Sequence, residues 1–89
     1  MQYKEIVADG TYTIKTGGGY FQGITVNAPG SGTIQICDQT TVAVPYIAGA
    51  TAFALPAAGT YLDYDCHFTT ALTIKIASSS SMSITVEYY

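Results

Sequence analysis

Residues 63–68, DYDCHF, hold the densest group of side chains that could do chemistry. Asp63, Asp65 and His67 have the same parity, so on a β-strand they would share one face, and two carboxylates with an imidazole can hold a divalent metal. Along a strand, however, these side chains spread over roughly 13 Å, which is too wide for one ion. We therefore predict a solvated strand face or a hydrogen-bonded turn here, and no metal site.

Motifs for nucleophilic catalysis and phosphate binding are absent from the sequence. Cys66 and His67 are adjacent and would point to opposite faces of a strand, which disfavours a thiolate–imidazole pair. No serine stands in a G-x-S-x-G pattern, and GGGYFQG is neither a phosphate-binding loop nor a dinucleotide fingerprint. With one histidine and no arginine, we predict no enzymatic activity, no catalytic residues and no cofactor.

The two cysteines, Cys37 and Cys66, permit one disulfide bridge or two free thiols. Free thiols are the usual state in a protein made in the cytoplasm, and the start of the chain, MQYKEIVADG, has no signal-peptide core. Without a C-x-x-C pair or a His/Cys cluster, a structural zinc site is not expected.

Charge is the sharpest compositional signal, because charged residues make up 10% of the chain. Lys4, Lys15 and Lys75 are its only basic residues, and the net charge is −3. Scattered lysines and a negative balance argue against nucleic-acid binding and against anionic membranes. So little charge is typical either of a neutral Thr/Ser-coated sandwich or of a surface that lies against protein neighbours, and we favour the second interpretation.

Alternation of apolar and polar residues recurs along most of the chain and predicts antiparallel strands with one buried face. The rows on the predicted buried faces are Ile24 and Val26; Ile34 and Ile36; Val42, Val44 and Tyr46; Leu72, Ile74 and Ile76; and Met82, Ile84, Val86 and Tyr88. The predicted strands are 2–8, 11–15, 20–27, 32–37, 41–47, 51–55, 59–63, 66–70, 72–77 and 82–88.

Glycine, proline and serine separate these runs and predict the turns, with 27–32 a tight reversal and 78–81 a serine link. Pro45 lacks an N–H and places strand 41–47 at a sheet edge. Residues 48–59 are rich in alanine but carry glycine and proline, so we expect a short strand or apolar loop there. The predicted fold is a single all-β domain over 1–89, an antiparallel β-sandwich.

Eight tyrosines allow a further interpretation, because exposed aromatic rings can stack on sugars. A carbohydrate-binding module would be favoured by a planar row of such rings. The chain has no tryptophan, and its tyrosines are dispersed except at Tyr88 and Tyr89. Core filling and protein contacts remain the more ordinary uses of tyrosine.

Two segments, GITVNAPGSGTIQICD and LPAAGTYLDYDCHFTTALTIKIA, resemble small virion proteins of tailed bacteriophages. The matching positions are 23–38, 55–61, 63–65 and 68–74. The resemblance implies a β-sandwich or jelly roll that decorates a particle. Such proteins are often capsid cement, bound as trimers on the head shell where they bridge major capsid subunits, and others are head fibres or tail components.

We accordingly predict a capsid decoration protein located on the virion surface, a homo-oligomer expected to be a trimer, whose partner is the major capsid protein. An 89-residue domain has a marginal core, which oligomerisation would supplement. The predicted protein-interface residues are aromatic side chains near the chain ends and in the first hairpin: Tyr3, Tyr20, Phe21, Tyr88 and Tyr89.

Overall fold

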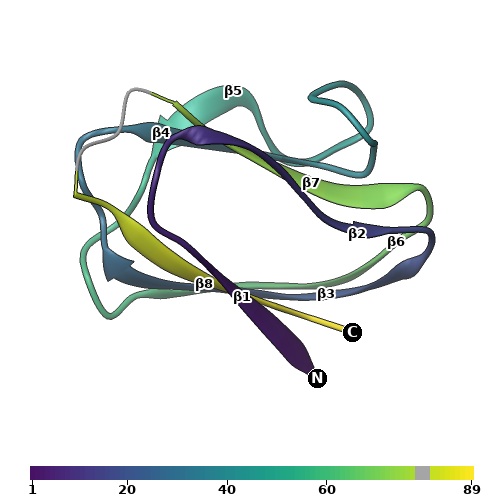
Figure 1. The fold of residues 1–89 in the computed structure, drawn as a ribbon, viewed down its shortest axis with the longest axis horizontal. Helices are drawn as coiled ribbons and strands as arrows, with labels where there is room; N and C mark the ends of the chain where they lie inside the picture. The colour runs from purple at the N-terminus through teal and green to yellow at the C-terminus, as the bar shows by residue number, and fades with distance from the viewer. Residues whose placement is uncertain (78–80) are drawn as a thin grey trace.

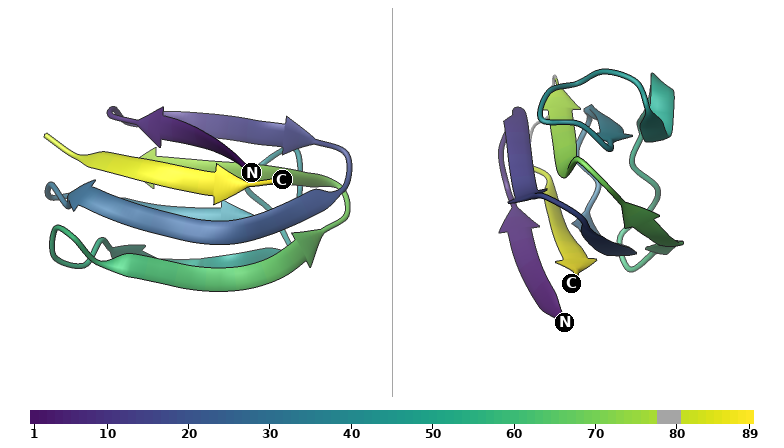
Figure 2. Two further views of the ribbon diagram at one scale, coloured as in Figure 1. Left: turned by 90° about the horizontal axis from the view of Figure 1, so that it is seen from below. Right: turned by 90° about the vertical axis from the view of Figure 1, so that its right-hand side faces the viewer.

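The computed structural model describes residues 1–77 and 81–89, so most of the predicted serine link at 78–81 lies outside the described residues. Within these described residues, eight strands form two four-stranded antiparallel sheets packed face to face (Figures 1 and 2). The strands are β1 (Gln2–Ile6), β2 (Gly10–Thr16), β3 (Gly19–Ala28), β4 (Thr33–Cys37), β5 (Tyr46–Ala54), β6 (Tyr61–Phe68), β7 (Ala71–Ala77) and β8 (Ser83–Tyr88). The prediction of an antiparallel β-sandwich is therefore confirmed.

The strand order is that of a jelly roll. One sheet runs β1-β8-β3-β6 and the other β2-β7-β4-β5. One long folded ribbon is formed by four antiparallel pairs of strands: β1–β8, β2–β7, β3–β6 and β4–β5. Two further pairings, β3–β8 and β4–β7, bring two of these pairs together in each sheet. Rolling the ribbon in this way gives a two-sheet sandwich from strands that are distant in sequence.

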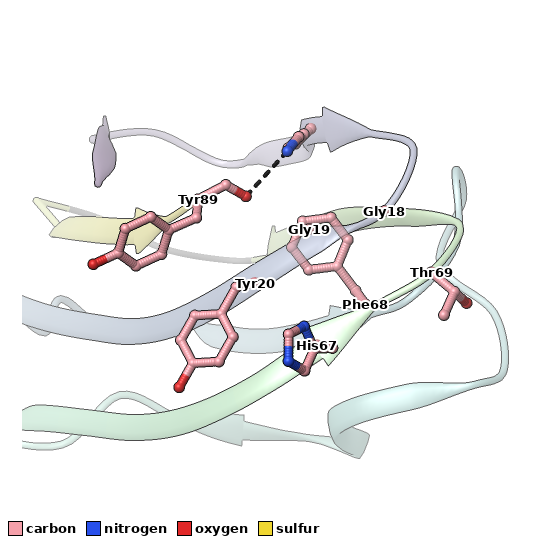
Figure 3. A pocket seen from close by; sticks show the side chains of 8 residues that line it. Gly18, Gly19, Tyr20, His67, Phe68, Thr69 and Tyr89 are labelled. Atoms are coloured by element: carbon pink, nitrogen blue, oxygen red, sulfur yellow. Dashed lines mark hydrogen bonds between the residues drawn. The ribbon is translucent and has the colours of Figure 1, made fainter.

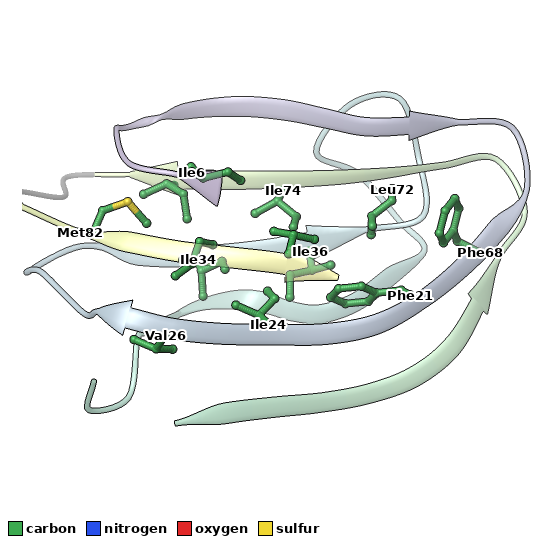
Figure 4. Close-up of a cluster of buried hydrophobic side chains, with 13 residues drawn as sticks. Ile6, Phe21, Ile24, Val26, Ile34, Ile36, Phe68, Leu72, Ile74 and Met82 are labelled. Carbon is green, nitrogen blue, oxygen red and sulfur yellow. The ribbon is translucent and has the colours of Figure 1, made fainter. Parts of the chain in front are cut away.

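The core lies between the sheets and is made by the alternating apolar residues of both (Figure 4). The predicted rows in or beside β3, β4, β7 and β8 are buried except at Tyr88, which is partly buried, and Phe21 and Phe68 pack with them. The fully or nearly fully buried members are Ile6, Phe21, Ile24, Val26, Ile34, Ile36, Phe68, Leu72, Ile74, Ile76, Met82, Ile84 and Val86. Alternation identifies most of this core because each strand presents one face to the opposing sheet, but Ile6, Phe21 and Phe68 are not in the predicted rows.

The predicted strand at 41–47 is wrong over most of its length. Residues 38–45 form bends rather than a strand, and Val44, assigned to a buried row, is 72% exposed. This segment is held by other contacts: Thr73 Oγ1 donates to the carbonyl of Gln39 at 2.5 Å, and the N–H of Asp38 donates to the carbonyl of Pro45 at 2.9 Å. Pro45 directly precedes β5, which is an edge strand.

Two other boundaries differ from the prediction. Residues 46–54 form one strand, β5, in place of a break near Gly49, which has φ of +79° within the strand. Residues 61–68 form one strand, β6, where two were predicted. Asp65 has φ of +49° and lies where the register between β3 and β6 shifts, so the apparent break is a bulge inside a continuous strand.

Candidate interaction surface

Three tyrosines and a histidine, contributed by four adjacent strands of one sheet, lie on its outer face. Tyr3 belongs to β1, Tyr89 follows β8, Tyr20 belongs to β3 and His67 to β6. Tyr20 and His67 are directly opposite in register, and Tyr89 exchanges two backbone hydrogen bonds with Tyr20, at 2.8 and 3.3 Å. We call Tyr3, Tyr89, Tyr20 and His67 the aromatic row.

The rings at the centre of this row contact one another edge to face. The ring centroids of Tyr20 and His67 are 5.1 Å apart at an interplanar angle of 77°, and those of Tyr20 and Tyr89 are 5.8 Å apart at 65° (Figure 3). Such geometry contributes about 0.5–1.5 kcal/mol per pair beyond simple burial. Tyr20 is therefore held from both sides, and the rings present a defined surface.

A hollow of about 650 Å³ opens beside these rings. Lys15, Gly18, Gly19, Phe68 and Thr69 complete its lining. The Lys15 ammonium donates to the main-chain oxygen of Tyr89 at 3.1 Å, as the dashed line in Figure 3 shows. A Cβ added at Gly19 would lie 2.6 Å from both that oxygen and Phe68 Cζ, so glycine is what allows the chain after β8 to approach β3.

Tyr3 lies at the other end of the row, on the edge strand β1. Its side chain is 74% exposed and, with Met1, Thr85 and Glu87, lines a second hollow of about 330 Å³. Glu87 is directly opposite Tyr3 in register, and Tyr89 is two residues further along the chain. Tyr3 and Tyr89 are therefore diagonal neighbours on one face of the sheet.

The prediction that Phe21 serves as a surface anchor is corrected by the structure, and Tyr88 is partly buried with its side chain on the core side of the sheet. Phe21 is 0% exposed and stacks on Tyr64 in the core, with centroids 5.1 Å apart and planes at 16°. Tyr88 lies opposite Phe21 in register and packs against the core cluster. Successive side chains of a strand point to opposite faces. Because Tyr20 and Tyr89 point outward, their chain neighbours Phe21 and Tyr88 point into the core. Of the predicted interface residues, Tyr3, Tyr20 and Tyr89 remain on the surface.

Sequence reasoning missed the contributions of His67, Lys15 and Tyr61 to this face. From the sequence, His67 is a candidate only for a metal ligand or for a partner of the Cys66 thiol. Its contact with Tyr20 depends on the register of β3 with β6, which the sequence pattern does not give. Tyr61 lies against Gly23, where an added Cβ would be 2.6 Å from the tyrosine hydroxyl oxygen. Partial burial, and then the nearby Glu87 carboxylate, raise the pKa of Tyr61.

The residues considered for metal and thiol chemistry do not converge on a site. Asp63, Asp65 and His67 are exposed along β6, and within residues 1–77 and 81–89 no three His, Cys, Asp or Glu side chains are grouped to hold a metal ion. Both cysteines are free: Cys37 is buried and Cys66 is half-buried. Burial raises the pKa of each thiol, and the Asp65 and Asp38 carboxylates raise that of Cys66 further.

No protein-family model matches the sequence, and no curated protein or solved structure is significantly similar to it. In the part of the chain that the structure describes, there is no helix long and apolar enough to cross a membrane. The fold and the surface together define a small jelly-roll protein with an aromatic outer face on one sheet.

Proposed function

We propose that this protein is a structural component of a tailed-bacteriophage particle, of the capsid decoration type, which binds the assembled head shell through the aromatic row. The observation that carries the proposal is the row itself, in which Tyr3, Tyr89 and Tyr20 lie on one outer face. Protein interfaces are enriched in tyrosine and depleted of charge at their centres, and this chain is only 10% charged. The resemblance of segments 23–38 and 55–74 supplies the partner, the major capsid protein.

The activity of such a protein would be mechanical. A protein that binds the assembled shell, and not its separate subunits, stabilises the shell by mass action. A single 89-residue subunit offers a small contact, so a useful affinity requires several copies held together on neighbouring shell subunits. The aromatic row suits this role because three of its rings, those of Tyr20, His67 and Tyr89, are held by contacts with one another and lose little freedom on binding.

Co-sedimentation with shells that lack the protein tests the proposal. Wild-type protein is expected to pellet with the shells at a saturating copy number. Tyr3→Ala and Tyr89→Ala are expected to weaken binding about tenfold each, the loss of an ordinary interface contact of roughly 1–2 kcal/mol. Val44→Ala is the matched control, because Val44 is also highly exposed but lies in the 38–45 segment beside the other sheet.

The thermal stability of each free variant separates a binding effect from an effect on folding. Unchanged melting temperatures with reduced shell binding would support an interface role for Tyr3 and Tyr89. A protein that never pellets with shells, or a Val44→Ala variant impaired as much as Tyr89→Ala, would contradict it.

A second function, saccharide binding, is favoured by one specific observation. Tyr20, His67 and Tyr89 border the larger hollow together with Lys15 and Thr69, so ring faces and hydrogen-bonding groups occur in one concave site. A glycan array would test it: specific saccharide binding that is abolished by Tyr20→Ala would favour this function. Binding to shells without any glycan signal would favour the decoration function.

A further inference from the structure

The four edge strands of the sandwich differ in how they are protected against pairing with another chain. In β2 the register shifts between Thr13 and Lys15, and in β5 it shifts on both sides of its contact with Ile36. In β6 the register shifts near Asp65, whose φ is positive. Bulges of this kind twist an edge away from a potential partner. Among the described strands, these three edges are all interrupted.

The fourth edge, β1, has no bulge, although it carries the charged residues Lys4 and Glu5. Gln2–Ile6 pairs with β8 over five consecutive residues without a register shift. Four of its five residues are exposed and only Ile6 is buried, so most of β1 extends past the opposing sheet (Figures 1 and 2). Within the described chain, β1 has one strand neighbour, and its other side faces solvent. A regular open edge of this kind is a template for adding another strand.

We infer that β1 pairs with β1 of a second copy of this chain, antiparallel and about a two-fold axis, to join two β1-β8-β3-β6 sheets into one continuous sheet. The partner edge must itself be regular if the ladder is to run its full length. Because β2, β5 and β6 are interrupted, the β1 edge of another copy is the edge that meets this condition. Such an interface is isologous and closes after two copies.

Charge selects the register of this pair. Centring the ladder on Lys4 would place the two Lys4 side chains directly opposite each other, and centring it on Glu5 would do the same for the carboxylates. Like charges in directly opposed positions are destabilising. Centring on Tyr3 instead places Lys4 opposite Gln2 of the second copy and pairs the two Tyr3 rings on the outer face. Aromatic cross-strand pairs are favourable, so the Tyr3-centred register is expected.

The shape of the surface agrees with this register. The smaller hollow, lined by Met1, Tyr3, Thr85 and Glu87, lies on the same outer face as Tyr3. The Tyr3 ring of the second copy would enter from the open edge and cover it. Two aromatic rows would then continue across the two-fold axis, with the Tyr3 pair at the centre.

The pair is expected to be weak in solution. A five-residue ladder buries much less than the roughly 1,600 Å² of a standard stable interface, which places it among transient contacts. A dissociation constant on the order of 100 μM is therefore expected. Copies held side by side on a larger surface would pair far more completely, because their effective concentration rises to about the millimolar range.

Oxidative cross-linking tests the register. Directly opposed Cα atoms in an antiparallel ladder are about 4.5–5.5 Å apart, which suits a disulfide, so Tyr3→Cys is expected to form a covalent dimer readily. In the same register the two Lys4 positions are offset from each other by two residues along the strands and lie roughly 8 Å apart, so Lys4→Cys is expected to cross-link about tenfold more slowly. The unsubstituted chain, with Cys37 buried and Cys66 half-buried, is the background control.

Sedimentation equilibrium tests the pairing without cross-linking. The mass is expected to rise from 9.4 kDa towards twice that value with concentration. Tyr3→Lys, which opposes two positive charges, should weaken association at least about tenfold. Val44→Lys makes the same charge change at an equally exposed site and should have no effect.

A mass that stays at one copy, a mass of three copies, or equal cross-linking of Tyr3→Cys and Lys4→Cys would overturn the inference. None of these results depends on shell binding, so the two proposals can fail separately.

Discussion

Asp38 and Thr70 lie 32 residues apart in the sequence, and the backbone N–H of Thr70 donates a 2.8 Å hydrogen bond to the Asp38 carboxylate. The same carboxylate also accepts from the N–H groups of Thr69 at 2.9 Å and Ala71 at 3.2 Å. Asp38 follows β4, and these donors lie in the turn after β6 and at the first residue of β7, so one side chain fastens the end of β4 to the connection between the two sheets.

Replacing Asp38 with asparagine is expected to destabilise the protein by about 1 kcal/mol, a modest value because the carboxylate is partly accessible to water. An amide offers one acceptor oxygen where the carboxylate offers two, and it lacks the negative charge that strengthens these bonds. Urea denaturation of Asp38→Asn measures the change. Asp63→Asn, an exposed position on β6, is the control. Equal losses in both variants, or none at Asp38, would contradict the role described.

The contribution of Asp38 is expected to depend on pH. Partial burial alone would raise the pKa of this carboxyl, but the hydrogen bonds from Thr69, Thr70 and Ala71 outweigh it and lower the pKa below its ordinary value of 3.8. A group whose folded pKa is lowered stabilises the fold above its unfolded pKa and loses that effect as pH falls through the folded value. The stability difference between wild type and Asp38→Asn should therefore be constant from about pH 5 upward and shrink below about pH 4. A difference that grows on acidification would contradict this.

Gly18 and Gly19 are expected to respond very differently to alanine. At Gly19 a Cβ would lie 2.6 Å from Phe68 Cζ and from the Tyr89 main-chain oxygen, whereas at Gly18 the nearest atom is 3.5 Å away. Gly19→Ala should therefore cost about 1–3 kcal/mol, a typical penalty for overpacking, and disturb the ring contact between Tyr20 and Tyr89. Gly18→Ala should cost little. Thermal unfolding and the NMR shifts of the tyrosine rings measure both, and similar behaviour of the two variants would be inconsistent with this packing.

The two thiols are expected to differ in access. Cys37 is buried and contacts the backbone of Ala43, so alkylation of this residue should require opening of the 38–45 segment. Cys66 is half-buried with a raised pKa, so it should react in the folded protein, but more slowly than a free cysteine. Mass spectrometry after timed alkylation with iodoacetamide measures both rates. Faster labelling of Cys37 than of Cys66 would contradict the burial described.

The sheet core was predictable from the sequence because alternation is a local signal. Ile34 and Ile36, for example, are buried as their spacing indicates. At Val44 the alternation predicts a buried strand residue, but residues 38–45 form bends. Their conformation depends on contacts with residues distant in sequence, such as the hydrogen bond from Thr73 to Gln39. Near Asp65 the sequence predicts a break between two strands, whereas the structure has a bulge within one strand. The bulge depends on how β6 pairs with β3, which the sequence of β6 alone does not indicate.

The aromatic row was predictable only in part. The sequence indicates that Tyr20 and Phe21 point to opposite sides, but it does not say which is buried. His67 lies opposite Tyr20 because of the register between β3 and β6. Tyr89 lies beside Tyr20 because β8 pairs with β3, although the two residues are about 70 positions apart in the sequence. These relationships are set by the jelly-roll topology, which periodicity alone does not encode.

The most direct test of the proposed function is a cryo-electron microscopy map of purified particles of the tailed phage that, under the proposal, carries this chain. The account predicts density for the two-sheet sandwich on the outside of the head shell, with Tyr3, Tyr20 and Tyr89 turned toward the capsid subunits. A particle that lacks the chain would contradict the account, and so would a sandwich whose aromatic row faces solvent while another face contacts the shell.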